Sequence, residues 1–158
     1  MLTMTYGAVG DDLVVAVCGR EPLSVADWSE LERCVEDLLR PLRPARRAIK
    51  ILVFTDEGAP NARQRASIVG LLRGATARVA VVTSSVIARN VVTAFGWLRM
   101  PMKGFAPTQV SSVAPYLELS NEQLDQALSQ AAALAPRIGR VECVEVAVAA
   151  RNTGAQLR

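Results

Sequence analysis

Two adjacent carboxylates, Asp56 and Glu57, hold the position in this chain that most favours chemistry or binding. Only Thr55 separates them from the apolar run 48–54, and Pro60 and Asn61 come shortly after them. The apolar run is typical of a buried strand, and a proline followed by an asparagine is typical of a helix start. We therefore expect an exposed acidic loop at the carboxyl end of a strand, where α/β folds commonly place ligand and partner contacts.

The groups that most catalytic sites need are missing from the sequence. The chain has no histidine, so Ser-His-Asp and Cys-His arrangements are impossible, and it contains no Walker-type phosphate loop. Neighbouring carboxylates on an exposed turn are normally just solvated, so Asp56 and Glu57 make a poor acid/base pair. We predict that the protein is not an enzyme and has no catalytic residues.

The cysteines give no sign of a metal site. Cys18, Cys34 and Cys143 lie far apart in the sequence, and no C-x-x-C pair occurs. Structural zinc sites depend on clustered Cys and His, so we expect no metal and no cofactor. Cys18 falls in an apolar strand and Cys34 on the apolar side of a helix, and both are interpreted as small buried hydrophobic residues.

Composition predicts a soluble, packed domain. The 158 residues are 51% hydrophobic and 21% charged. No apolar run reaches the roughly 18 residues that cross a bilayer, and no secretion signal begins the chain, so we expect a cytoplasmic protein without membrane insertion. The 18 basic residues are scattered apart from a cluster at Arg43, Arg46 and Arg47, and the net charge is only +3. This pattern is unlike a nucleic-acid-binding face, and we predict no nucleic-acid partner.

Strand and helix patterns alternate along the first two thirds of the chain. Strands are predicted at 3–8, 13–17, 48–54, 78–83 and 103–105. Helices are predicted at 24–42, 61–73, 86–98 and 108–117. In the third of these helices, the spacing predicts that Val86 or Ile87 packs against the sheet.

The remainder of the chain reads as an addition to this core. Ser120 and Gln123 form a capping-box pattern that opens a helix ending near residue 136. The run 141–148 is β-prone and predicts an added edge strand or a segment that pairs with another chain. We predict a single domain over residues 1–150, with a core at 3–118, an addition at 119–150 and a disordered tail at 151–158. Since the core looks complete by itself, we favour a homodimer that forms through the C-terminal helix.

This order of elements resembles the STAS family, the domain of anti-sigma-factor antagonists, and in particular the bacterial SpoIIAA-like proteins. The matching segments are 53–61, then 79–85, then 102–105 before a helix that starts after Pro107. The resemblance covers about residues 3–118. It implies an α/β fold with a mixed sheet of about four or five strands flanked by helices, here with an extra C-terminal helix and a further strand. It also implies a regulatory module that docks on a protein partner.

The loop departs from the family pattern at the residue that the family phosphorylates. STAS antagonists carry a Ser or Thr at the start of the helix, and phosphorylation there switches binding to a kinase-like anti-sigma factor. In this chain Thr55 is the nearest hydroxyl, and it follows the strand immediately. Thr55 is therefore a phosphorylation candidate by resemblance alone. Asp56 and Glu57 offer a second interpretation, since they already supply the negative charge that a phosphate would bring.

A third interpretation is an anion pocket at the helix start, built from Gly58, Asn61, Arg63 and Arg65. The plain alternative for each of these residues is a solvated loop or helix surface. Our leading hypothesis is a non-enzymatic module that docks on a protein through the 55–61 loop and the helix after it. The competing hypothesis is a small-molecule or lipid-binding domain with a cavity between sheet and helices.

Overall fold

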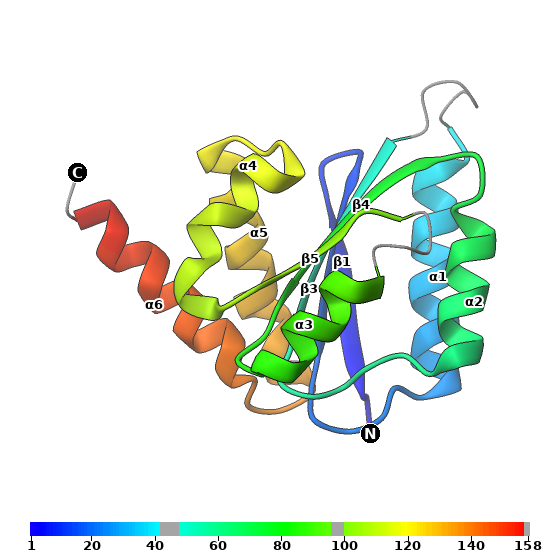
Figure 1. Cartoon of the computed structure of the whole chain (residues 1–158), viewed down its shortest axis with the longest axis horizontal. Helices are drawn as coiled ribbons and strands as arrows, with labels where there is room; N and C mark the ends of the chain where they lie inside the picture. Colours follow the sequence, from blue (N-terminus) through cyan, green and yellow to red (C-terminus); the bar gives the residue numbers. More distant parts are fainter. Residues whose placement is uncertain (42–47, 96–99, 157–158) are drawn as a thin grey trace.

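A five-stranded mixed sheet forms the centre of the molecule (Figure 1). The structure is a computed structural model that describes residues 1–41, 48–95 and 100–156, so the cluster at Arg43, Arg46 and Arg47 lies outside the described residues. The strands are β1 (Met4–Val9), β2 (Leu13–Cys18), β3 (Ala48–Thr55), β4 (Thr76–Val82) and β5 (Met102–Phe105). They lie side by side in sequence order, with β1 antiparallel to β2 and all other neighbours parallel. Each predicted strand up to residue 105 is confirmed.

The helices lie on both faces of the sheet. They are α1 (Val25–Leu39), α2 (Ala62–Leu71), α3 (Val86–Phe95), α4 (Val113–Leu117), α5 (Asn121–Leu134) and α6 (Glu142–Gln156). Two 3-10 segments, η3 (Pro107–Ser112) and η4 (Ala135–Arg137), precede α4 and follow α5. Figure 1 shows α1 and α2 on one side of the sheet and α4, α5 and α6 on the other.

The topology explains this division. Parallel crossovers are right-handed, and here every crossover moves one strand further in the same direction. Consequently α1, α2 and α3 all fall on one face, where their apolar residues pack with Val14, Ile51 and Val79 of the strands. The opposite face carries the alternate residues of the same strands, and only the C-terminal part of the chain is left to cover it.

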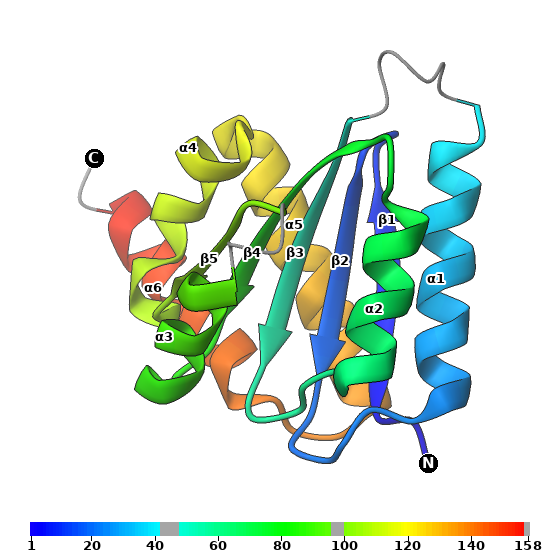
Figure 2. The same ribbon diagram turned by 45° about the vertical axis from the view of Figure 1, so that its right-hand side comes forward.

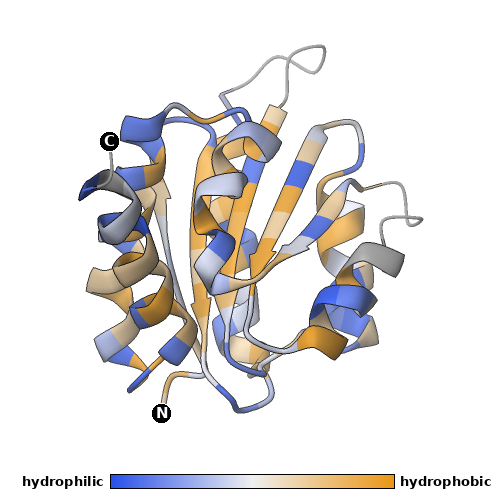
Figure 3. Cartoon of the chain, turned by 60° about the vertical axis from the view of Figure 1, so that its left-hand side comes forward, coloured by the Kyte–Doolittle hydropathy of each residue, from blue (hydrophilic) through white to orange (hydrophobic). Residues whose placement is uncertain are grey.

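The core therefore has two halves, one on each side of the sheet. Strand residues that point away from α1, such as Val15, Leu52 and Val82, are fully buried beneath α4, α5 and α6. In Figure 3 the strands are largely orange, as expected for strands that are buried on both faces. This corrects the prediction that the core is complete at residue 118, because α5 contributes buried residues to it. These are Leu124, Ala127, Leu128, Ala131 and Leu134.

Three of the predicted helix starts are confirmed in detail. Asn61 with Gln64 and Ser120 with Gln123 both form full capping boxes at the starts of α2 and α5. Ser24 caps α1 by accepting the N–H of Asp27. The carboxylate of Asp27, however, turns to Thr3, accepting its backbone N–H at 2.6 Å and its hydroxyl at 2.7 Å. These two hydrogen bonds connect the start of α1 to the start of β1.

The C-terminal segment is a helix rather than the predicted strand. The β-prone run 141–148 forms most of α6, and the tail predicted as disordered from residue 151 continues this helix to Gln156. Val141, Val144 and Ala147 are buried at helical spacing beside Cys143. Their burial on one side of a helix outweighed the β propensity of the valines. Within the described ranges, no helix is long and apolar enough to cross a membrane.

Candidate functional site

The predicted docking loop, residues 55–61, lies at the carboxyl edge of the sheet. Figure 2 shows β2 and β3 pointing to the edge at which α1 and α2 begin. The short connection after β2 lies directly beside the loop: the backbone N–H groups of Glu57 and Gly58 both donate to the carbonyl of Gly19. Two successive parallel strands thus deliver two loops to one place, as the sequence predicted for the second of them.

Thr55 closes the base of the loop. Its side chain is buried, and its hydroxyl donates to the carbonyl of Gly58 at 2.6 Å. A kinase could reach this hydroxyl only if the turn opened first. The geometry gives Thr55 a clear role in holding the loop, while its phosphorylation stays a prediction from the family resemblance.

Gly58 is fitted against its neighbours so closely that no side chain has room. A methyl group built at this position would lie 2.8 Å from the carbonyl oxygen of Gly19 and 2.9 Å from that of Glu21. Its N–H donates to Gly19 at 2.7 Å. The requirement for glycine here is a close approach of two backbones, and no positive φ is involved.

The carboxylate of Asp56 makes the contact that sequence reasoning missed. Its two oxygens accept the backbone N–H groups of Glu142 at 2.8 Å and Cys143 at 2.9 Å, in the first turn of α6. The partners are 86 and 87 residues away in sequence. One sequence feature pointed to this contact: no residue near 140 can cap a helix that starts at Glu142. This feature could not be interpreted while the segment was predicted to be a strand.

The exposed part of the loop is therefore smaller than predicted. Glu57, Ala59 and Asn61 are exposed, whereas Thr55 and Gly58 are buried and Asp56 is half-buried against α6. The side chain of Asn61 accepts the N–H of Gln64, so it caps α2. Of the two acidic residues, Glu57 alone presents its carboxylate freely at this surface.

The proposed anion pocket has few donors left to offer. The N–H of Gly58 is already donated to Gly19, and that of Asn61 to the side-chain oxygen of Gln64 at 2.9 Å. Arg65 is half-buried and donates to the carbonyl of Pro60 at 2.6 Å. Arg63 is exposed on α2. The anion pocket stays a prediction.

Acidic side chains surround the exposed part of the loop. Glu21 and Glu142 are exposed on the two segments that touch it. Arg20 forms a long ion pair with Glu142, with 3.7 Å between nitrogen and oxygen, and both side chains are largely exposed. This edge of the molecule therefore carries several carboxylates, together with Arg20 and with Arg140, which pairs with Glu145 at 3.0 Å.

Exposed apolar side chains mark the same edge. Val25 in the first turn of α1 is 77% exposed, and in the first turn of α3 Val86 is 60% and Ile87 77% exposed. The prediction that Val86 or Ile87 packs against the sheet is wrong, because the first turn of α3 extends past the end of β4. These side chains lie on either flank of the loop and widen the surface that a partner can contact.

Two cysteines lie next to the loop on the inside. Cys18 is buried at the end of β2, and burial raises the pKa of its thiol to about 12. Cys143 is fully buried in α6, where burial and then the charge of Asp56 raise its pKa. Both thiols are kept protonated and unreactive while the fold is closed. Cys34, predicted to be buried, is only half-buried. In the part of the chain that the structure describes, no three Cys, Asp or Glu side chains group as metal ligands would.

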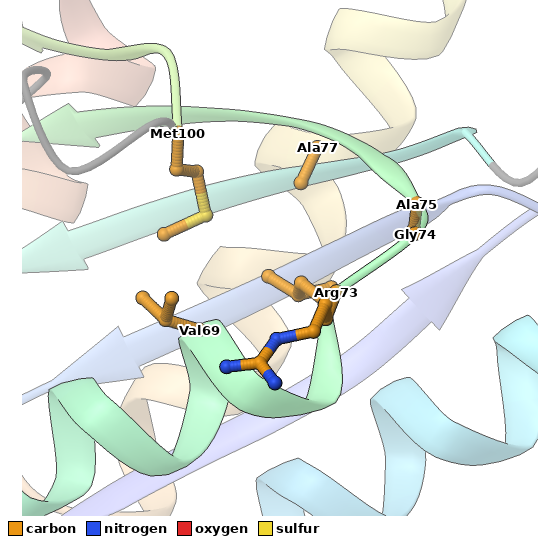
Figure 4. A pocket seen from close by; sticks show the side chains of 7 residues that line it. Val69, Arg73, Gly74, Ala75, Ala77 and Met100 are labelled. Atoms are coloured by element: carbon orange, nitrogen blue, oxygen red, sulfur yellow. The ribbon is translucent and has the colours of Figure 1, made fainter.

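One cavity lies between a helix and the sheet, at the opposite edge from the loop. It has a volume of about 320 Å³ and lies where α2 ends and β4 begins (Figure 4). Its wall is mainly apolar, with one charged residue. The lining residues are Val69, Leu72, Arg73, Gly74, Ala75, Ala77 and Met100.

A comparison with solved structures identifies the fold. The chain is similar to an uncharacterized protein of the DUF3478 family from Shewanella loihica PV-4, whose crystal structure has a SpoIIAA-like fold. The TM-score is 0.50 and the sequence identity 16%, over 66% of this chain and 87% of that chain. No family model matches the sequence, and no curated protein matches it. The chain therefore has the SpoIIAA-like fold that its resemblance to STAS domains predicted.

Proposed function

We propose that the protein is a non-enzymatic regulatory module that docks on a protein partner through the exposed part of the 55–61 loop and the start of α2. The observation that carries the proposal is the construction of this edge. A loop fixed by hydrogen bonds from Thr55 and Gly58 presents Glu57 and Ala59 to solvent beside exposed aliphatic residues. A rigid, exposed surface of mixed polarity loses little conformational entropy on binding a protein.

The charges at this edge indicate the chemistry of the partner. Glu21, Glu57 and Glu142 are exposed around the loop, and Arg20 is paired with the last of them. A partner surface that carries Arg or Lys would be attracted to these carboxylates, and the attraction would weaken with added salt. The SpoIIAA-like fold supports a binding role, since it is shared with STAS domains.

The proposal is tested by a photo-crosslinking residue placed at Glu57 in the native host. We expect a discrete protein adduct from this position. Asp11 is the matched control, because it is an exposed acid in the β1–β2 turn at the other end of the sheet. An adduct of equal yield from both positions, or from neither, would contradict the proposal. Asp56 is unsuitable for this test, since its replacement also removes hydrogen bonds to α6.

The charge of the partner is tested once an adduct is identified. Glu57→Arg should weaken the purified complex about tenfold or more, and Asp11→Arg should leave it unchanged. The affinity should also fall as the salt concentration rises. A salt-independent affinity would show that the carboxylates at this edge do not steer the partner.

The cavity at the end of α2 supports a second candidate, the binding of a small amphiphile. Its volume of about 320 Å³ is at the lower limit for a ligand site, its wall is apolar, and Arg73 stands at its margin. A short acyl chain with an anionic head group matches this chemistry. Native mass spectrometry of the purified protein would show such a ligand as added mass, and Ala77→Trp should remove it by filling the cavity.

A further inference from the structure

The first turn of α6 depends on a residue from another part of the chain. The first N–H groups of any helix lack partners within the helix, and a Ser, Thr, Asp or Asn just before the helix normally accepts one of them. Here the residues before Glu142 are Arg140 and Val141, whose side chains cannot do so. The carboxylate of Asp56 accepts two of these N–H groups instead, at 2.8 and 2.9 Å.

A carboxylate suits this position for two physical reasons. Its negative charge lies at the positive end of the α6 dipole, and each of its oxygens accepts one hydrogen bond. This turn is also linked to the opposite loops by the Arg20–Glu142 ion pair, which is 3.7 Å long and exposed. Such a pair contributes little. Of these two polar contacts, the hydrogen bonds of Asp56 are the stronger.

The turn that Asp56 holds covers part of the apolar core. Val141 is 1% exposed, and the side chain of Cys143, which belongs to the turn itself, is completely buried in the half of the core that includes Phe54 of β3. If the turn lifted while the rest of α6 stayed in place, Cys143 would become accessible. Cys18, at the end of β2, belongs to the other half of the core, which α1 and α2 cover.

We propose that Asp56 is a latch that couples the docking loop to α6. Any group that draws the Asp56 carboxylate away competes with the N–H groups of Glu142 and Cys143, and the first turn of α6 then opens. The coupling is reciprocal: lifting the turn frees the carboxylate, and occupying the carboxylate lifts the turn. The latch itself does not require that a partner docks on the loop, so it can be tested on the isolated protein.

The test measures how fast each cysteine reacts with a thiol reagent, with the modified site located by mass spectrometry. In Asp56→Asn the carboxylate is replaced by an amide that accepts only one N–H and turns its NH₂ group towards the other. We expect Cys143 to react about tenfold faster than in the unaltered protein, in line with the loss of a helix cap. Cys18 should keep its slow rate, and half-buried Cys34 provides the fast reference.

Glu57→Gln is the matched control, because it removes the neighbouring exposed charge and leaves the two hydrogen bonds in place. It should not change the rate at Cys143. Hydrogen exchange offers a second measurement: the amides of Glu142 and Cys143 should lose protection in Asp56→Asn while those in the middle of α5 keep theirs. Equal acceleration at Cys18 and Cys143, or no acceleration at Cys143, would overturn the latch. Neither measurement involves a partner, so failure of the docking proposal would leave this result intact.

Discussion

A methyl group at Gly58 would lie 2.8 Å from the carbonyl oxygen of Gly19 and 2.9 Å from that of Glu21. Both oxygens belong to backbone, which cannot rotate away as a side chain can. We therefore predict that Gly58→Ala lowers the free energy of unfolding by about 1–3 kcal/mol, the usual cost of overpacking. Chemical denaturation followed by circular dichroism would measure it.

Gly70 is the matched control for this substitution. It lies in α2, and a methyl group there meets nothing within 4 Å. Because alanine is the better helix former, Gly70→Ala should raise the free energy of unfolding by about 0.5–1 kcal/mol. If both variants changed the free energy of unfolding in the same direction, the close approach of the two loops would not explain the glycine at position 58.

Asp27 predicts a specific dependence of stability on pH. Partial burial acts to raise the pKa of its carboxyl, but hydrogen bonds from the backbone and hydroxyl of Thr3 outweigh this, and the pKa is lowered from 3.8. A depressed pKa in the folded state means that the carboxylate stabilises the fold above about pH 4 and that this contribution is lost as the pH falls through the folded pKa.

We predict that Asp27→Asn costs about 1 kcal/mol of the free energy of unfolding at pH 7, the usual contribution of such hydrogen bonds. The difference from the unaltered protein should shrink as the pH falls below 4. Unfolding curves at pH 7 and pH 3 would test this. Asp37→Asn is the control, because Asp37 forms only an exposed pair with Arg40 on α1, and it should change stability little at either pH. A pH-independent cost at Asp27 would contradict the assignment.

At the scale of the elements, α2 and α5 begin with the same capping motif. Asn61 with Gln64, and Ser120 with Gln123, each form a full capping box. We predict that Asn61→Ala and Ser120→Ala each cost about 1 kcal/mol of the free energy of unfolding, since each removes one helix cap. Thermal or chemical denaturation would measure both.

The pair also tests whether the start of α2 belongs to the docking surface. Both variants should lose stability, but the complex with a partner should weaken only for Asn61→Ala. If neither variant affects the complex, the start of α2 is not part of the docking surface. Ser120 lies outside the docking loop, and this makes it the suitable comparison.

Most elements could be predicted because their signals are local. Continuous apolar runs predicted β2, β3 and β4, and capping residues such as Asn61 and Ser120 predicted the starts of helices. The segment 141–148 failed because β-branched valines favour a strand while their three- and four-residue spacing favours a helix. Burial of one side of the segment against η3, α5 and β3 favoured the helix.

The position of the candidate loop was predicted, but the contacts of its residues were predicted only in part. The acidic loop does lie at the carboxyl edge of β3, as its place after an apolar run indicated. The roles of Asp56 and Gly58 depend on contacts with residues 140–143 and 19–21, which are far away in sequence. No local pattern reports such contacts, so the same carboxylate that looked like a docking group proved to be the cap of α6.

At the scale of the molecule, the order of the strands determines which face needs the C-terminal helices. Since α1, α2 and α3 all cover one face, the opposite face of the sheet depends on α4, α5 and α6 for burial. The apolar side of α5 is therefore used within the chain. A homodimer through the C-terminal helices stays a prediction, and it would have to use the outward side of α6.

This dependence makes a strong prediction about a shortened chain. A fragment that ends at residue 118 contains everything that the resemblance to STAS domains covers, yet it loses α5 and its five buried residues. Burying three leucines and two alanines contributes about 5–8 kcal/mol, which is comparable with the whole free energy of unfolding of a typical domain. We predict that the fragment does not fold cooperatively. Its near-ultraviolet circular dichroism should be lost, and a dye that reports exposed apolar surface should bind to it.

Residues 119–158 supplied as a separate chain provide the control. Because α5 and α6 form most of their contacts with the sheet, η3 and each other, the added piece should restore a cooperative unfolding transition. Its Asp56-dependent turn should re-form as well, so Cys143 in the reassembled protein should again react slowly. A fragment 1–118 that unfolds cooperatively alone would show that this face of the sheet tolerates water and does not depend on α5 and α6.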